Sequence, residues 1–404
     1  MLYELSGVDF LKIGGDIKNY SSTWEGVCKT IYKSSSFGSE LEKSNYYKND
    51  LETILSSAKN DYEKTAFIFE FVKSKIKWNG FYSKYTDKGV KKAYKEGAGN
   101  AAEINLILTS MLRSAGINAN PVLVSTKNNG IPLFPTLDGF NYVISKVDFS
   151  DGNYIILDAT EKYATANILP YRTLNWYGRE VFKNGDSKQV KLTPNSLTED
   201  VNFLFVKIDE MGDVSGMFRK SLTDHNAMFY RQKNNVKKEE DVITSTEEKY
   251  GIEIENFKVL NAKNISKPIM QTVKFTGEDL IEEINGKLYF SPLLFLAKNE
   301  NPFKSGERNF PVDFGMPWKD KYSASITIPD GYTVESYPEE LAIGLPENMG
   351  VFQYKVVLKE NKINLSSTTQ INSSIIPPNY YSAIKEFYKQ LVEKQTEKII
   401  LVKK

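Results

Sequence analysis

The chain has 404 residues, of which 41% are apolar and 25% are charged, a composition typical of folded proteins, and its length predicts two or three domains. Its 52 basic and 51 acidic residues nearly cancel, which argues against a nucleic-acid partner, and no run of about eighteen apolar residues predicts a transmembrane helix. A single Cys and a single His exclude an internal disulfide and a structural zinc site, and we expect no metal and no cofactor.

The first segment, residues 1–58, is expected to be the tail of a preceding domain followed by a helical linker. Its apolar residues Trp24, Val27 and Ile31 recur at helical spacing. The sequence after Met1 has neither the charged region nor the apolar region of a signal peptide, which by itself favours the cytoplasm.

The second segment, residues 59–188, begins with predicted helices at 61–77 and 87–96. A third helix is predicted to start after Asn100, because Asn100 and Glu103 have the spacing of a capping box, in which each side chain binds the other residue's backbone N–H. The apolar face of this helix is formed by Ile104, Ile107, Leu108, Met111, Leu112 and Ala115.

Strands are predicted after this helix at residues 120–125, 141–147 and 154–157. The turn signal Asp151-Gly152-Asn153 separates the last two. We therefore expect the side chains near the ends of these two strands to lie close together in one sheet.

The loop at residues 170–182 is rich in aromatic residues and includes Tyr171, Trp176 and Tyr177. Aromatic rings beside a cleft can bind a sugar or a peptide by stacking. The alternative is that these rings pack one domain against another, which is the more common use of such residues.

The third segment, residues 189–376, contains short runs of alternating residues and is predicted to be a β-rich, sandwich-like domain with a helical insertion near 222–249. Within it, Ile284-Asn285-Gly286-Lys287 is a hairpin signal. The last segment, residues 377–404, is expected to be a helix that follows Pro377-Pro378, with a short tail.

Three short motifs in the second segment carry a resemblance to a known family. They are Gly99-Asn100-Ala101-Ala102-Glu103-Ile104 at the helix start, Phe140-Asn141-Tyr142-Val143, and Leu157-Asp158-Ala159-Thr160. Their order resembles the core of the transglutaminase-like superfamily and covers residues 60–175. The resemblance implies an α+β chain, with a papain-like transglutaminase core followed by the β-rich domain and the C-terminal helix.

Active members of the bacterial subgroup read Gly-Asp-Cys-Lys-Asp-Lys and Phe-Asn-His-Val at the first two motifs. The resemblance therefore implies that Ala101, Tyr142 and Asp158 occupy the positions of a catalytic cysteine, histidine and aspartate. Acyl transfer needs a thiolate at a helix start, an imidazole base and a carboxylate that orients it. Alanine has no nucleophile and a neutral phenol is a poor base, so we expect no intact catalytic residue. Asn141 is the alternative match for the histidine, and natural loss explains both changes more simply than an engineered Ala101.

We expect Asn100, Glu103, Asn141, Trp176 and Tyr177 to line the former cleft. The first hypothesis for the function is a non-catalytic protein that binds a peptide, a protein, a cell-wall fragment or a glycan. The second is a hydrolase or transferase that uses an unrecognised polar cleft. The third is a structural module that links domains, and it predicts a cleft filled by side chains.

A catalytic site formed instead by Cys28 and His225 is a remote alternative. Cys28 lies in an amphipathic stretch and is expected to be a buried apolar residue. His225 lies in a polar, turn-like stretch, and a catalytic pair would also need a third orienting group.

The resemblance also bears on the location of the protein. Relatives with this architecture are mostly exported envelope proteins of Bacteroidetes-like bacteria, and they carry a β-sandwich before the core. We therefore expect Met1 to be a processed or shortened start and the full-length protein to be periplasmic or envelope-associated, with a cytoplasmic location as the alternative.

Overall fold

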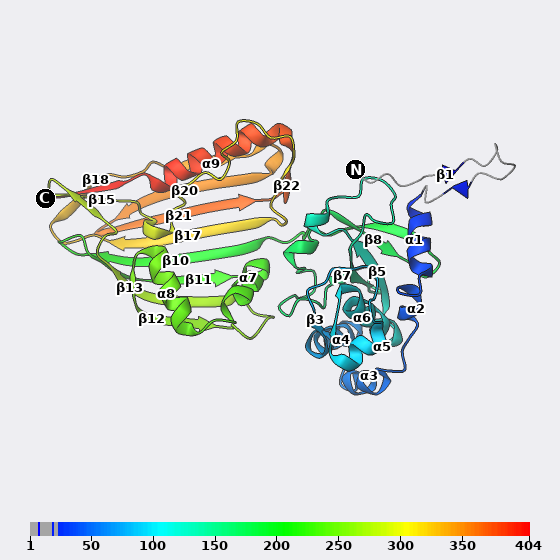
Figure 1. Ribbon diagram of the computed structural model, residues 1–404. Coiled ribbons are helices and arrows are strands. Elements are labelled where there is room, and N and C mark those ends of the chain that lie inside the picture. Colours follow the sequence, from blue (N-terminus) through cyan, green and yellow to red (C-terminus); the bar gives the residue numbers. More distant parts are fainter. Residues whose placement is uncertain (1–6, 9–17, 20–22) are drawn as a thin grey trace. The chain divides into compact units, whose positions relative to one another are not determined.

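The computed structural model describes residues 7–8, 18–19 and 23–404, and the chain divides into a first unit, residues 1–194, and a second unit, residues 195–404 (Figure 1). Each unit has its own apolar core. Within the described ranges, no helix is long and apolar enough to cross a membrane. The predicted tail of a preceding domain, residues 1–20, lies outside the described residues apart from the paired strands β1 (Gly7–Val8) and β2 (Lys18–Asn19).

The first unit is built around one buried helix. Its described helices are α1 (Trp24–Lys33), α2 (Gly38–Leu41), α3 (Lys48–Leu55), α4 (Asp61–Lys75), α5 (Val90–Glu96) and α6 (Ala101–Ser114). Every residue of α6 from Ala101 to Leu112 is buried, because the other elements surround this helix on all sides. The predicted capping box of Asn100 and Glu103 is present at its start.

A five-stranded antiparallel sheet packs on α6 in the order β7-β6-β5-β8-β9. Its strands are β5 (Asn118–Val124), β6 (Tyr142–Asp148), β7 (Tyr154–Leu157), β8 (Tyr177–Val181) and β9 (Ser187–Lys191). A short parallel pair, β3 (Lys77–Trp78) and β4 (Ala98–Gly99), sets Trp78 opposite Gly99, just before α6. The start of α6, β6 and the end of β7 thus belong to one packed core.

The second unit contains an eight-stranded sheet in the order β12-β13-β11-β10-β17-β21-β20-β19. Only the central pair, β10 with β17, is parallel. The strands are β10 (Thr198–Ile208), β11 (Val214–Leu222), β12 (Glu253–Leu260), β13 (Ile269–Gly277), β17 (Trp318–Thr327), β19 (Leu341–Gly344), β20 (Gly350–Lys359) and β21 (Lys362–Ile371). Alternation of buried and exposed residues, as from Asn202 to Ile208 in β10, gives this sheet one apolar face.

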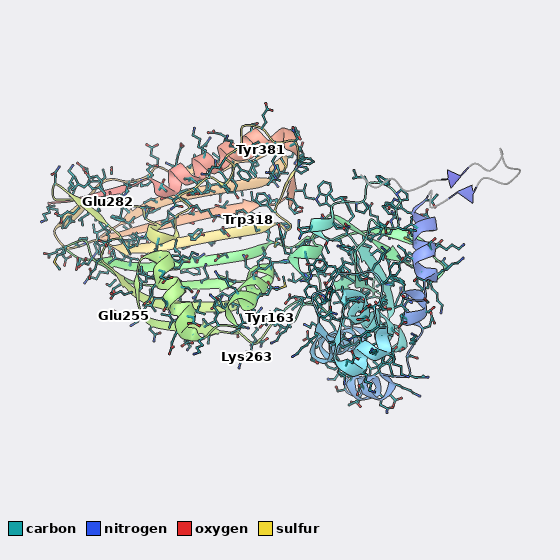
Figure 2. The ribbon with its side chains drawn as sticks, in the orientation of Figure 1. Tyr163, Glu255, Lys263, Glu282, Trp318 and Tyr381 are labelled. Atoms are coloured by element: carbon teal, nitrogen blue, oxygen red, sulfur yellow. The ribbon has the colours of Figure 1, made fainter. Side chains whose placement is uncertain are left out.

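Three helices and a small sheet cover that apolar face. The helices are α7 (Asp224–Asn234), α8 (Glu239–Tyr250) and α9 (Tyr381–Thr396), and Figure 2 shows Tyr381 at the start of α9. The small sheet has the order β14-β15-β23-β18, with β14 (Glu282–Ile284), β15 (Lys287–Phe290), β18 (Tyr332–Ser336) and β23 (Ile399–Lys403). A further two-stranded pair joins β16 (Val312–Asp313) and β22 (Ile375–Ile376).

The structure confirms the predicted fold class: a mixed α+β chain with an N-terminal core, a β-rich second part and a C-terminal helix. It adds three details to the sequence prediction. The predicted linker contributes Val27, Cys28 and Ile31 to the first core. The layer that faces the large sheet combines the four-stranded sheet with helix α9. The predicted tail contains β23, which pairs with β15 and β18.

Candidate functional site

The first residue of α6 is Ala101, which the resemblance assigns to the position of a catalytic cysteine. Its side chain is fully buried. Its backbone N–H, which at a helix start could otherwise bind an anion, donates to the carbonyl oxygen of Phe81 at 3.2 Å. This position therefore offers neither a nucleophile nor a free backbone donor.

Tyr142 and Asp158 lie side by side in the interior. Tyr142 is the first residue of β6, and Asp158 follows the last residue of β7. The phenol of Tyr142 donates to Oδ2 of Asp158 at 3.0 Å, and both side chains are fully buried. The structure thus brings together the two positions that the motifs predicted for the base and the orienting acid.

Three further donors hold the Asp158 carboxylate. Its Oδ1 accepts from the backbone N–H of Thr160 at 3.0 Å, from the Thr160 hydroxyl at 2.7 Å and from Nδ2 of Asn105 at 2.9 Å. Asn105 also binds the backbone on both sides, through the carbonyl of Val143 and the N–H of Ala159. The carboxylate therefore ties α6 to the ends of β6 and β7.

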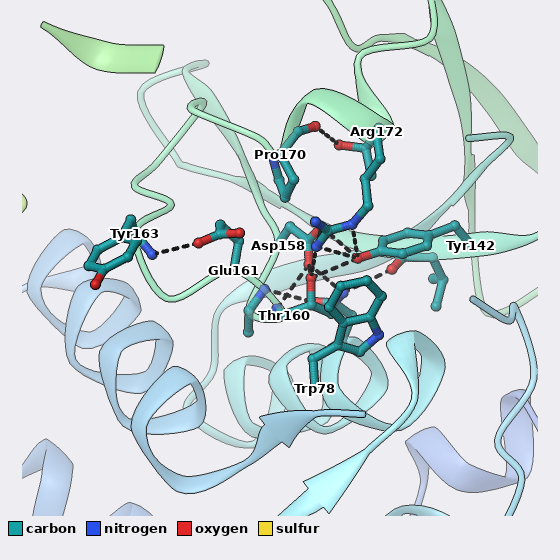
Figure 3. A network of polar contacts seen from close by, with 12 residues as sticks. Trp78, Tyr142, Asp158, Thr160, Glu161, Tyr163, Pro170 and Arg172 are labelled. Carbon is teal, nitrogen blue, oxygen red and sulfur yellow. Dashed lines mark hydrogen bonds and ion pairs between the residues drawn. The ribbon is translucent and has the colours of Figure 1, made fainter. Parts of the chain in front are cut away.

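Arg172 closes the network from the other side, as Figure 3 shows. Its Nε and Nη2 lie 3.3 and 3.2 Å from the Tyr142 hydroxyl oxygen, and Nη2 lies 2.5 Å from the Thr160 hydroxyl and 4.0 Å from Oδ2 of Asp158. The guanidinium also stacks 4.3 Å above the ring centre of Trp78. We call Asn105, Tyr142, Asp158, Thr160 and Arg172 the Tyr142–Asp158 network.

The electrostatics of this network keep the phenol neutral. Burial raises the pKa of Tyr142 well above its ordinary value, and the adjacent carboxylate of Asp158 raises it further. Burial disfavours the charge of Arg172, but Tyr142 and Asp158 outweigh it and raise the pKa of the guanidinium. Tyr142 therefore donates a hydrogen bond to Asp158 and does not accept a proton at neutral pH.

Three other residues predicted to line a cleft are engaged in structural bonds. The Asn100 side chain binds the N–H of Glu103 and the carbonyl of Tyr85. The fully buried carboxylate of Glu103 accepts backbone N–H groups from Lys88, Gly89 and Asn100. The Asn141 side chain binds the backbone N–H and the hydroxyl of Thr126.

The aromatic loop has a mixed character. Trp176 is half-buried and has a positive φ of 59°, and its carbonyl accepts from the N–H of Leu192. Tyr177 at the start of β8 and Tyr171 are exposed, and Tyr171 lies under the ammonium group of Lys127 at 4.9 Å. These contacts of the aromatic rings do not involve the Tyr142–Asp158 network. The loop meets the network through Arg172, which lies in the short turn Tyr171–Thr173.

The remote alternative of a Cys28–His225 pair gains no support. Cys28 is fully buried on α1 of the first unit, and burial raises the pKa of its thiol. His225 is buried on α7 of the second unit. Across the described residues, no group of three or more His, Cys, Asp or Glu side chains could hold a metal ion.

The sequence predicted Tyr142 and Asp158 but missed three of their partners. The sequence did contain a signal for Asn105, because this polar residue lies one helical turn after Ala101, between the apolar residues Ile104 and Leu106. Trp78 and Arg172 had none, because they meet the site only through tertiary packing.

Comparisons with known proteins agree with the fold. A sequence model of the transglutaminase-like superfamily matches residues 50–159, and a model described as a domain of unknown function with solved structure, DUF3858, matches residues 286–401. No curated protein matches the chain. The fold is similar to the crystal structure of a "putative protease" from Parabacteroides distasonis, with a TM-score of 0.53 and 13% identity. The match covers 95% of this chain and 59% of the protease chain, so this chain spans less than two thirds of the length of that protein.

Proposed function

We propose that the transglutaminase-like core domain, residues 50–159, has lost acyl-transfer chemistry and serves as a binding or scaffolding unit. Acyl transfer through a covalent intermediate needs a nucleophile and a base that can take its proton. Ala101 cannot supply the first, and the phenol of Tyr142 cannot supply the second at neutral pH.

One observation carries the proposal: the Tyr142 hydroxyl donates to Asp158 and accepts from Arg172. In a working triad the carboxylate stabilises the positive charge that forms on the imidazole. Here Arg172 supplies a permanent positive charge beside the same carboxylate. The charge of Arg172 in place of an imidazolium explains how Asp158 can remain buried although no histidine is present. A buried carboxylate without a compensating charge would lower the stability of the fold.

Burial supports a scaffolding role for the former triad over binding at the old site. Ala101, Tyr142 and Asp158 are all fully buried, as the structural hypothesis expected of a filled cleft. A peptide, cell-wall or glycan ligand would therefore bind at another surface of the chain, and the former triad would hold the domain together. The hypothesis of an unrecognised catalytic cleft has no comparable support, because Asn100, Glu103 and Asn141 are all used in structural bonds.

We also propose that the chain works as part of a larger, exported protein of the bacterial envelope. Two observations support this: the match spans 59% of the structure from Parabacteroides distasonis, and that protein comes from a bacterium of the kind in which such envelope proteins are expected. Fractionation of the native host, with the full-length protein detected by antibody, tests this location, and recovery from the cytoplasm alone would contradict it.

The proposed loss of acyl-transfer activity is tested by turnover assays with the purified chain. Incorporation of a labelled amine into a glutamine peptide and cleavage of a peptide library are measured for the wild type, for Asp158→Asn and for Ala101→Cys/Tyr142→His, beside an active transglutaminase. We expect no turnover by any of the three, since the double variant regains the side chains but not access to them. Turnover by the wild type that Asp158→Asn abolishes would refute the proposal.

A further inference from the structure

The eight-stranded sheet of the second unit has a second face that points away from its core. Along β10, Leu204 and Val206 are buried in the core, whereas Phe203 and Phe205 are 41% and 45% exposed. Residues two apart on a strand lie about 7 Å apart on one face. The two phenylalanines therefore form a short aromatic platform on what we call the open sheet face.

Four cationic side chains surround this platform through the strand register. Arg219 of β11 lies opposite Phe203, and Lys207 follows Phe205 on the same face of β10. Lys274 of β13 lies opposite Met217, which itself lies opposite Phe205. Lys321 of β17 lies opposite Val201 on the other side. Neighbouring strands are about 4.8 Å apart, so the four cations are within reach of one bound molecule.

Within the described part of the chain, these cations have no acidic partners. Among the ion pairs of the described residues, none involves Lys207, Arg219, Lys274 or Lys321. On the same face Glu199 is paired with Lys319 at 3.3 Å. The desolvation cost of such cations is small because they are exposed or half-buried, and their charge remains available to a ligand.

The net charge of the second unit does not explain the cations of the open sheet face. Residues 195–404 carry 27 Lys and Arg against 30 Asp and Glu, so the unit as a whole is slightly acidic. Asp200 and Asp320 point into the core side, where they pair with Lys220 at 3.1 Å and Lys298 at 2.8 Å. The positive open sheet face is therefore a local feature and does not follow from composition.

Small polar residues form the rest of the platform's surroundings. Ser323 and Ser325 of β17 lie opposite Phe203 and Phe205, and Ser366 and Asn364 of β21 lie opposite those serines. Short side chains leave the faces of the two rings uncovered. They also offer hydroxyl and amide groups that can both donate and accept hydrogen bonds.

We propose that the open sheet face binds an acidic polysaccharide, a linear polymer of sugars that carry carboxylates. Sugar rings would stack on Phe203 and Phe205, carboxylates would pair with Arg219, Lys207 and their neighbours, and sugar hydroxyls would bond to the serines and Asn364. A large sheet is twisted, so its face suits a linear chain better than a flat bilayer. The acidic balance of the whole unit disfavours a denser polyanion such as a nucleic acid.

This inference concerns the second unit and is independent of the catalytic status of the first. Binding is measured with the full chain by isothermal titration against polygalacturonate, with dextran as the neutral polymer. We expect saturable binding to polygalacturonate that weakens as salt rises, and none to dextran. Phe203→Ala/Phe205→Ala should weaken binding about tenfold or more, because it removes the stacking surface.

The charge contribution is measured separately. Arg219→Gln and Lys207→Gln should weaken binding and make it less dependent on salt. The controls are Phe310→Ala and Lys237→Gln, which alter a more exposed ring and an exposed cation outside the strands of this sheet and should bind as the wild type does. Circular dichroism of each variant shows that it is folded.

Two kinds of outcome overturn the proposal. One is the absence of binding to polygalacturonate at low salt, or binding that the three open-face variants (Phe203→Ala/Phe205→Ala, Arg219→Gln and Lys207→Gln) leave unchanged. The other is equally tight binding of a single-stranded oligothymidylate or of anionic vesicles that the same variants abolish, which would assign the face to nucleic acid or to membrane lipid.

Discussion

The Tyr142–Asp158 network and the open sheet face both combine aromatic rings with charge, yet they differ in how the charge is satisfied. In the network every charged group is buried or nearly so and has several bonded partners. On the open sheet face the cations around Phe203 and Phe205 are exposed or half-buried and have no acidic partner among the described residues. Buried, satisfied charge rigidifies a fold, whereas exposed, unpaired charge is available to a ligand. The comparison therefore separates a structural role from a binding role within one chain.

The largest effect should come from Asp158→Ala. The substitution removes the acceptor for Tyr142, Thr160 and Asn105 and leaves Arg172 without its opposite charge, so we expect the first unit to lose about 3–5 kcal/mol of unfolding free energy. Urea denaturation checks this, with Asp186→Asn on the surface as the control. A loss no greater than that of the control would show that the network contributes nothing to stability.

A smaller loss is expected for Tyr142→Phe. The ring stays in place, but Asp158 loses one donor and Arg172 loses one acceptor, which should cost about 1–3 kcal/mol. The same denaturation experiment measures it. Unchanged stability would mean that water replaces the hydroxyl and that the site is open to solvent.

The raised pKa of Tyr142 predicts a specific dependence on pH. In the unfolded chain the phenol ionises near its ordinary pKa of 10.0, whereas in the folded chain it stays protonated to higher pH. Stability that is present below pH 10 is therefore lost as pH rises above it, by up to about 1.4 kcal/mol per pH unit for one such group. Comparison of the wild type with Tyr142→Phe between pH 9 and 11 isolates this group, and equal slopes for the two proteins would contradict the prediction.

The smallest effect on stability is expected at the open sheet face. Phe203→Ala/Phe205→Ala removes two exposed rings and should change the unfolding free energy of the second unit by less than about 1 kcal/mol per ring, although it weakens polysaccharide binding. Denaturation and titration of the same sample give both values. A large loss of stability would place these rings in a structural role like that of the network.

Local sequence signals predicted much of the first unit. The Asn100–Glu103 capping box located the start of α6, and the two strand motifs located Tyr142 and Asp158. Arg172 and Trp78 could not be predicted, because their contacts join residues distant along the chain and depend on the packed fold. The same reason explains why β23 was not predicted. It pairs with β15 and β18, and β15 lies more than a hundred residues before it in the chain.

The open sheet face was also hidden in the sequence. The run from Val201 to Ile208 contains alternating inward and outward apolar residues, so the sequence alone does not show that Phe203 and Phe205 face outward. The register that brings Arg219 and Lys321 to them depends on the pairing of β10 with β11 and β17, and the β10–β17 pairing is nonlocal.

The central claim is that the former triad is now structural, and a paired measurement on Asp158→Asn tests it most directly. Turnover of a glutamine peptide and the free energy of unfolding are measured for this variant and for the wild type. The account predicts no turnover by either protein and a clear loss of stability in the variant. Turnover by the wild type that disappears in Asp158→Asn, with stability unchanged, would contradict it.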